Sequence, residues 1–170
     1  MVAFIAISIL GVLCWNDGFM KALKTYKLGF DISGLILFLL VMVPTFIWLA
    51  VPAPNDVLRT DSTTPIVDTI GSVCQFLFIA CLCFVINKDR SSLCFSPWVI
   101  ASIACVLVYY VGWLLYYHGI ANAWIILMLT LPPCAAFILF AVDRKNFPAV
   151  LLATGFAVCH LIFGIVNFIK

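Results

Sequence analysis

The residues of this sequence that could do chemistry inside a membrane form two polar stripes within long apolar segments. Asp68, Ser72 and Gln75 fall at positions i, i+4 and i+7, and therefore on one face of a helix. His160 and Asn167 are seven residues apart in the last apolar segment and also share a face. Polar groups are costly in a bilayer, so each is a candidate for function. We expect both stripes either to bind a ligand or to join helices by hydrogen bonds.

Small residues continue the second stripe. Ala153, Ala157, His160, Gly164 and Asn167 follow a 4-3-4-3 spacing. Small and polar side chains on one helix face are typical of helix contacts in lipid, because they let two backbones approach closely. The seam predicts a contact with another helix of this chain or of a partner subunit.

Aromatic side chains repeat at the same spacing in a third segment, where Tyr109, Trp113 and Tyr116 stand at i, i+4 and i+7. With a helical rise of 1.5 Å per residue, we expect them at the same depths as the two polar stripes, with Tyr109 the deepest of the three. They predict one wall of a ligand pocket. The alternatives are an aromatic belt at the lipid headgroups and packing between helices without a ligand.

A polar loop precedes the first stripe and contains turn-forming residues after two prolines. Asn55, Asp56 and Arg59 lie in it, and an ion pair from Arg59 to a neighbouring carboxylate could hold the loop as a lid over the polar cluster. A solvated turn is the alternative.

Other chemistry finds less support in the sequence. Eight cysteines are present without a C-x-x-C pair, and the two histidines are not at ligand spacing, so we expect structural thiols, no metal site and no cofactor. Paired carboxylates, a hydrolase elbow and a phosphate loop are missing, which disfavours an enzyme. Chemistry on a lipid or isoprenoid stays open as an alternative.

Composition determines which elements must position these residues. The chain has 170 residues, of which 66% are hydrophobic and 9% charged, and its mean hydropathy is +1.24. Soluble domains are roughly half apolar and a quarter charged. We expect an all-α polytopic membrane protein with one transmembrane domain over 1–170 and no basic stripe for nucleic acid. A helix of roughly 20 residues crosses a bilayer, which predicts six spans, at 2–15, 35–52, 66–86, 98–117, 122–142 and 148–169. The first is short for a span, and a truncated or interfacial segment is the alternative there.

The basic residues predict the orientation. Seven of the nine Lys and Arg fall in the breaks 16–34, 87–97 and 143–147, whereas only Arg59 and Lys170 fall on the other side. Because cytoplasmic loops are rich in Lys and Arg, both termini and the 53–65 loop should face outward, in a plasma membrane. Residues 18–30 would form a helix with Lys21, Lys24 and Lys27 on one face, lying in the cytoplasmic interface or connecting in solvent.

Prolines interrupt two expected spans, at Pro44 in the second and at Pro132–Pro133 in the fifth. Each removes a backbone donor and should kink its helix. Matching kinks in two inverted three-span halves would indicate a transporter, whereas two independent kinks carry no such meaning.

Together these features predict a protein that binds or carries a small amphipathic or hydrophobic compound in an outward-facing polar and aromatic cavity. Its partners would be the lipid bilayer and that compound. The alternatives are a membrane enzyme for a lipid or isoprenoid, and an accessory or immunity-type subunit that docks a partner membrane protein.

Overall fold

A computed structural model describes residues 24–90 and 95–169 of the chain. Five helices are long and apolar enough to cross a membrane, which is compatible with an integral membrane protein. They match five of the predicted spans to within three residues at each end. The predicted first span at 2–15 lies outside the described residues. The helices are α2 (Ile32–Ala50), α3 (Pro65–Phe84), α4 (Pro97–Tyr117), α5 (Ala123–Asp143) and α6 (Phe147–Phe168).

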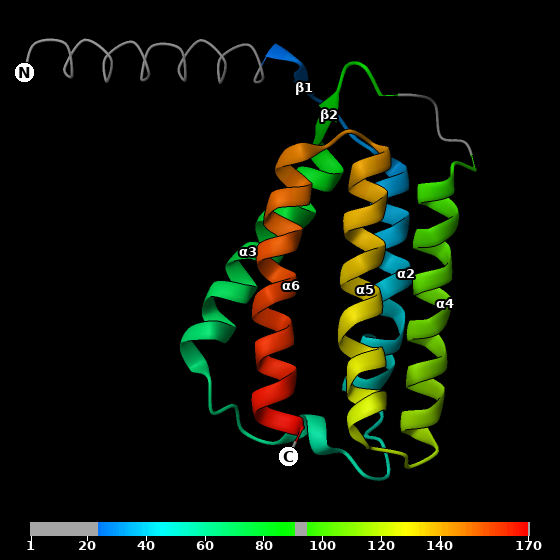
Figure 1. The fold of residues 1–170 in the computed structure, drawn as a ribbon, viewed down its shortest axis with the longest axis vertical. Helices are drawn as coiled ribbons and strands as arrows, with labels where there is room; N and C mark the ends of the chain where they lie inside the picture. The colour runs from blue at the N-terminus through cyan, green and yellow to red at the C-terminus, as the bar shows by residue number, and fades with distance from the viewer. Residues whose placement is uncertain (1–23, 91–94, 170) are drawn as a thin grey trace, which may run out of the picture.

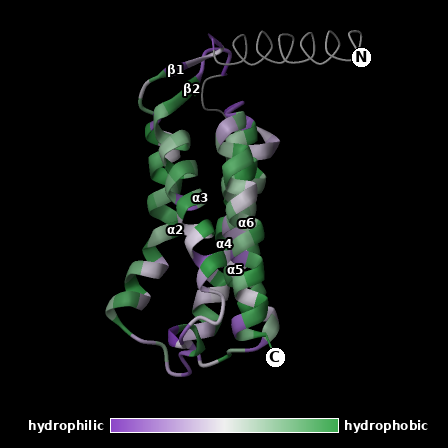
Figure 2. Cartoon of the chain, turned by 90° about the vertical axis from the view of Figure 1, so that its left-hand side faces the viewer, coloured by the Kyte–Doolittle hydropathy of each residue, from purple (hydrophilic) through white to green (hydrophobic). Residues whose placement is uncertain are grey.

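The helices form a bundle in which successive neighbours run antiparallel. α4 packs along α5, α5 along α6 and α6 along α3, while α2 makes less extensive contacts with α3, α4 and α5 (Figure 1). Hydrophobic residues extend along the length of the helices, and the hydrophilic residues gather mainly at the two ends of the bundle (Figure 2). This distribution suits a bilayer, in which only the ends of the helices meet water.

Local sequence signals set where the helices begin. The side chains of Asp31, Ser96, Asn122 and Asn146 each accept a hydrogen bond from a backbone N–H in the first turn of α2, α4, α5 and α6. Such N-caps satisfy donors that have no partner within the helix. Proline occupies the first turn of α3, α4 and α6, where its missing N–H costs nothing.

Both proline-containing helices are continuous through their prolines, so the predicted kinks stay predictions. Pro44 leaves the carbonyl of Leu40, four residues earlier, without its helical donor. The hydroxyl of Tyr110 in α4 donates to that carbonyl at 2.7 Å. A side chain of a neighbouring helix therefore replaces the lost backbone hydrogen bond.

The predicted helix at 18–30 is wrong in its last part. Tyr26–Leu28 forms a strand, β1, which pairs antiparallel with β2 (Val85–Asn87), and Tyr26 lies opposite Asn87. The backbone N–H of Gly29 continues the contact by donating to Phe84 at 3.0 Å. Pairing with a distant segment outweighs the helical pattern here, because β-branched residues of β2 favour extended backbone. Residues 18–23 lie outside the described part of the chain.

A buried polar cluster closes this end of the bundle. The carboxylate of Asp31 forms ion pairs with Arg90 and, at 3.0 Å, with Arg144, whose side chain is 5% exposed. Asn146 donates to the carbonyls of Cys81 and Val85, at 2.8 Å each. The cluster thereby joins the start of α2, the end of α3 and the turn between α5 and α6.

Candidate functional site

A cavity of about 400 Å³ lies within the bundle and extends from the middle of the helices to the loop before α3. This volume falls within the range of roughly 300–1,000 Å³ that is usual for ligand pockets. Four helices supply nearly all of its wall, and α4 adds one side chain. The lining residues are Phe38, Val41, Met42 and Thr45 of α2; Val67, Asp68, Gly71, Ser72, Gln75, Phe78 and Ile79 of α3; Tyr109 of α4; Leu129, Pro133 and Phe137 of α5; Phe156, Cys159, His160 and Phe163 of α6; and Ser62 of the loop before α3.

The structure brings five of the predicted site residues together at this cavity: Asp68, Ser72, Gln75, Tyr109 and His160. The stripe on α3 and the polar residue of α6 meet because the two helices pack antiparallel along their length. Helical spacing places the stripe on one face, and the packing of the bundle turns that face inward.

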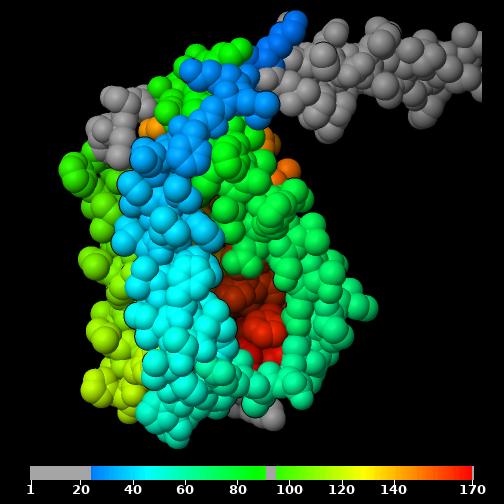
Figure 3. Space-filling model, turned by 180° about the vertical axis from the view of Figure 1, so that it is seen from behind, coloured from blue at the N-terminus to red at the C-terminus, as the bar shows by residue number. Residues whose placement is uncertain are grey.

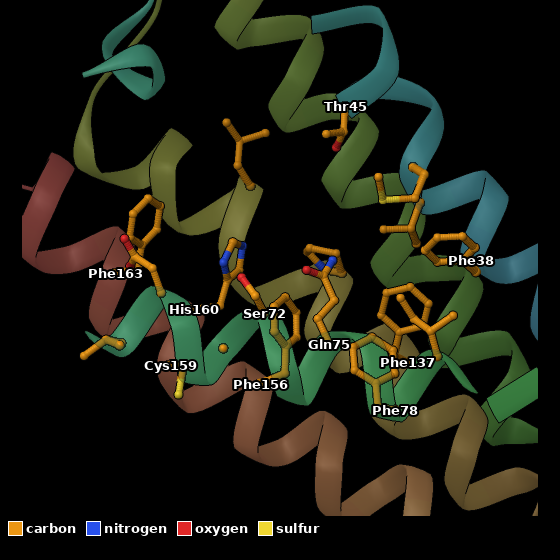
Figure 4. A pocket seen from close by; sticks show the side chains of 18 of the residues that line it. Phe38, Thr45, Ser72, Gln75, Phe78, Phe137, Phe156, Cys159, His160 and Phe163 are labelled. Atoms are coloured by element: carbon orange, nitrogen blue, oxygen red, sulfur yellow. The ribbon is translucent and has the colours of Figure 1, made fainter. Parts of the chain in front are cut away.

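The polar side chains in the cavity lack partners. Within 24–90 and 95–169, no hydrogen bond is made by the side chains of Ser72, Gln75 or His160, and Figure 4 shows these three between aromatic rings. Asp68 accepts one hydrogen bond, from the Thr64 hydroxyl at 3.2 Å. In the apolar interior of a bilayer, an amide or hydroxyl without a partner would cost roughly 1–3 kcal/mol. The arrangement therefore leaves donors and acceptors available to a ligand or to water.

Aromatic rings form the apolar part of the wall. Phe78 lies 5.0 Å from Phe137 and 5.5 Å from Phe156, between ring centroids. The imidazole of His160 stacks between Phe156 at 5.0 Å and Phe163 at 6.3 Å. These rings hold His160 in place by stacking, so its nitrogen atoms remain available for hydrogen bonds.

The cavity opens sideways, between α2 and α3. Figure 3 shows the opening, with α6 visible behind it. The two helices touch near the strands, where a Cβ atom on Gly34 would come within 2.9 Å of the Leu82 carbonyl oxygen, so glycine permits the approach. Towards their other ends the helices separate (Figure 1). Since Ser72 on α3 is exposed, the opening leads to the side of the bundle, which a bilayer would cover.

Two predicted wall residues lie elsewhere. Trp113 and Tyr116 do not line the cavity but are buried in the packed core. The Trp113 ring contacts the rings of Trp48, Tyr109, Tyr116 and Tyr117 at 5.7–6.3 Å between centroids. Tyr109, Trp113 and Tyr116 all lie in α4 as the spacing predicts, but only Tyr109 lines the cavity.

The predicted lid residues fasten the loop without lining the cavity. Asp56 accepts hydrogen bonds from Trp48 at 2.9 Å and from Tyr116 at 2.9 Å, and it pairs with Arg59 at 2.8 Å. Burial alone would raise the pKa of Asp56, but these hydrogen bonds and the charge of Arg59 outweigh burial and lower it from its ordinary 3.8. Asn55 donates to the Gly119 carbonyl at 2.8 Å. The loop is thus held against the ends of α2 and α4.

Asn167 also acts on this loop and does not line the cavity. Its side-chain oxygen accepts from the Thr63 backbone at 2.7 Å, and its amide donates to the Thr64 hydroxyl at 3.0 Å. Thr64 in turn donates to Asp68. Asn167 therefore positions the segment that begins α3, directly beside the cavity.

The small-residue seam of α6 packs inside this chain. Ala153 is 1% exposed, and a Cβ atom on Gly164 would lie 3.0 Å from the Thr130 hydroxyl of α5. Next to the seam, a Cβ atom on Gly71 of α3 would lie 3.2 Å from the Cβ atom of Cys159 in α6. The spacing predicts a close approach between two helices, and the structure shows this approach between α6 and its neighbours in the same chain.

The sequence interpretation missed most of the aromatic wall. Phe156 and Phe163 stand at i−4 and i+3 of His160, so their spacing would have placed them beside it. Phe38, Phe78 and Phe137 come from three helices and share no local pattern. Thr45 also lines the cavity, and its hydroxyl lies 3.2 Å from that of Tyr109. The sequence interpretation considered only the neighbouring Pro44 in this part of the chain.

Within the described residues, the site contains one thiol. All six cysteines in the described ranges are free, and one of them, Cys159, lines the cavity. The same ranges hold no group of three His, Cys, Asp or Glu side chains that could bind a metal ion.

Comparison with known proteins finds no family model, no curated protein and no solved structure that matches this chain.

Proposed function

We propose that this protein binds or carries a small amphipathic or hydrophobic compound in the cavity between α2, α3, α5 and α6. One observation carries the proposal. Three polar side chains, those of Ser72, Gln75 and His160, line an aromatic cavity of about 400 Å³ and have no hydrogen-bond partner within the described ranges.

The chemistry of the wall supports an amphipathic ligand. The phenylalanine rings offer apolar surface, which favours a hydrocarbon or ring system. The amide of Gln75 and the hydroxyl of Ser72 can each donate and accept a hydrogen bond. A compound with one polar group and one apolar part would satisfy both kinds of surface, whereas a purely polar solute would leave the aromatic rings facing it.

The sideways opening supports entry from the bilayer. A compound dissolved among the lipid chains would reach the cavity between α2 and α3 without crossing the polar end of the bundle. We place this protein in the plasma membrane, with a sixth span at 2–15, both termini outside and the 51–64 loop on the outer face. The support for this orientation is the excess of Lys and Arg at the other end.

The structure favours binding over the alternatives. A nucleophile needs a base within hydrogen-bond reach, but within the described chain His160 makes no hydrogen bond to Ser72 or Cys159. Part of the seam that suggested a docking subunit is covered by this chain's own helices, since Gly164 packs against Thr130 and Ala153 is 1% exposed. We therefore propose a binder or carrier.

Native mass spectrometry of the protein released from lipid nanodiscs tests the proposal. We expect a reproducible added mass of roughly a few hundred daltons, the size that such a pocket encloses. Ser72→Phe should abolish it by filling the cavity. Val73→Phe is the matched control, because Val73 is the next residue of α3, is 54% exposed and does not line the cavity.

A second variant separates binding from folding. Gln75→Leu removes an unpartnered polar group and keeps a similar volume, so it should leave thermal stability unchanged or higher and still reduce the adduct. Loss of the adduct in Val73→Phe as well, or its survival in both Ser72→Phe and Gln75→Leu, would contradict the proposed site. A bare protein in every preparation and with every lipid extract added would contradict the function.

A further inference from the structure

We propose that the compound in this cavity is a cationic amphiphile whose amine pairs with Asp68. This inference depends on the proposed function and specifies the class of ligand. Asp68 is the only charged residue among those that line the cavity.

The carboxylate of Asp68 has no cationic partner within the described chain. The described residues form three ion pairs, and these involve the carboxylates of Asp31 and Asp56. Asp68 accepts a single hydrogen bond, from the neutral hydroxyl of Thr64. A carboxylate that faces a largely apolar cavity is costly unless a charge compensates it, and an ammonium group in the cavity would supply that charge.

The charge of the surrounding end of the bundle also favours a cation. Among the described residues at this end, three aspartates, Asp56, Asp61 and Asp68, stand against one basic residue, Arg59. Arg59 is already engaged, since it pairs with Asp56 and lies 4.9 Å from the centre of the Trp48 ring. The formal charge of this set is therefore −2, which attracts cations and repels anions.

The opposite end of the bundle has the reverse balance. Its described basic residues are Lys24, Lys27, Lys88, Arg90, Arg144 and Lys145, and its acidic residues are Asp31, Asp89 and Asp143. The formal charge of that end is +3. An anionic amphiphile would find its favourable field there, and not at the cavity.

The neutral polar groups and the rings suit an ammonium head. The oxygen atoms of Ser72 and Gln75 can accept hydrogen bonds from an ammonium N–H. The aromatic rings that line the cavity can also attract a cation over a ring face. A carboxylate or phosphate head would instead meet the like charge of Asp68.

The shape of the cavity orients such a ligand. Asp68 lies in the first turn of α3, and the lining continues along this helix to Phe78. Ten residues of helix correspond to about 15 Å. The amine would therefore lie near the loop end of α3, and the apolar part would extend along α3 towards Phe38, Phe78 and Phe137.

A matched set of probes tests the charge class. We would measure binding of 6-phenylhexylamine, 6-phenylhexanol and 6-phenylhexanoate to the full chain in nanodiscs of zwitterionic lipid at pH 7. Uptake by protein-free nanodiscs is subtracted. The amine should bind about tenfold more tightly than the alcohol, as a charge-assisted contact predicts, and the carboxylate should bind most weakly.

Variants assign the effect to Asp68. Asp68→Asn keeps an acceptor for Thr64 and should lower the amine affinity to that of the alcohol, while the alcohol affinity changes by less than about twofold. Asp61→Asn is the control, because Asp61 is an exposed carboxylate of the same end that does not line the cavity. It should leave the preference intact, since exposed charges are screened. Thermal unfolding without probe checks that both variants fold.

The outcomes separate this inference from the proposed function. Equal binding of amine and alcohol, with no effect of Asp68→Asn, would overturn the cationic class and leave the proposed binding site standing. Preferred binding of the carboxylate would do the same. If none of the probes binds saturably and the protein also carries no adduct in native mass spectrometry, both proposals fail.

Discussion

The substitution Asp31→Asn should destabilise the protein by about 3–5 kcal/mol, the cost of breaking a buried ion pair by removing one partner. Asp31 is the acceptor for Arg90 and Arg144 at the strand end of the bundle. Asparagine has nearly the same volume and is an equally good N-cap, so the bond from Ser33 that begins α2 should persist. The measured change then reports the lost charge.

The exposed fractions of the two arginine side chains determine how much stability Asp31→Asn should lose. Arg144 and Asp31 are each 5% exposed, so Arg144 would stay buried after losing this carboxylate. Arg90 is 27% exposed and closer to a surface pair, which contributes only about 0–1 kcal/mol. Most of the effect should therefore come from Arg144. The double variant Asp31→Asn with Arg144→Met should recover part of the stability, because it removes the buried charge as well.

The assay is reversible unfolding in mixed micelles, with increasing dodecyl sulfate and tryptophan fluorescence as the signal. Asp89→Asn is the control, since Asp89 is an exposed carboxylate of the same end without an ion pair in the described ranges. A loss below about 1 kcal/mol for Asp31→Asn, the size expected of an exposed pair, would refute the reasoning. So would equal losses in Asp31→Asn and Asp89→Asn.

Two further predictions concern the opposite end and the orientation. The lowered pKa of Asp56 means that its stabilising contribution is complete above its ordinary 3.8 and is lost as the pH falls through the lower folded value. Unfolding midpoints should therefore drop below pH 3.8, and less steeply in Asp56→Asn; parallel curves for the two proteins would contradict this. In a background without the eight native cysteines, an impermeant maleimide added to whole cells should label Asp61→Cys and not Asp89→Cys, whereas the reverse pattern would invert the orientation.

The length of the apolar runs predicted the five long helices well, because a span needs enough consecutive apolar residues and its caps are local. The ends of α4 fall within one residue of the expected 98–117. Local pattern was insufficient at Tyr26–Leu28, where the partner strand is Val85–Asn87. A pairing between segments so far apart in the chain leaves no periodic signal near either strand.

In the candidate site, too, local sequence pattern predicted some features and missed those that depend on distant segments. Helical spacing placed Asp68, Ser72 and Gln75 on one face, and the structure turns that face into a cavity. The same spacing joined Trp113 to Tyr109, yet Trp113 is directed into the core. In this apolar chain the different faces of a helix have similar compositions. The spacing of residues along the helix therefore could not distinguish a face that lines a cavity from a face that packs against another helix.

The sequence by itself indicated the five helices apolar enough to cross a membrane, their approximate ends and the polar stripe on α3, because hydrophobicity, capping and periodicity are properties of a single stretch of chain. Only the tertiary structure decided which helices separate, and thus that a cavity opens between α2 and α3. It also decided that Asp31 and Arg144, which are 113 positions apart, share one buried ion pair. Both depend on how side chains of distant segments fill space together, and no local stretch of sequence contains that information.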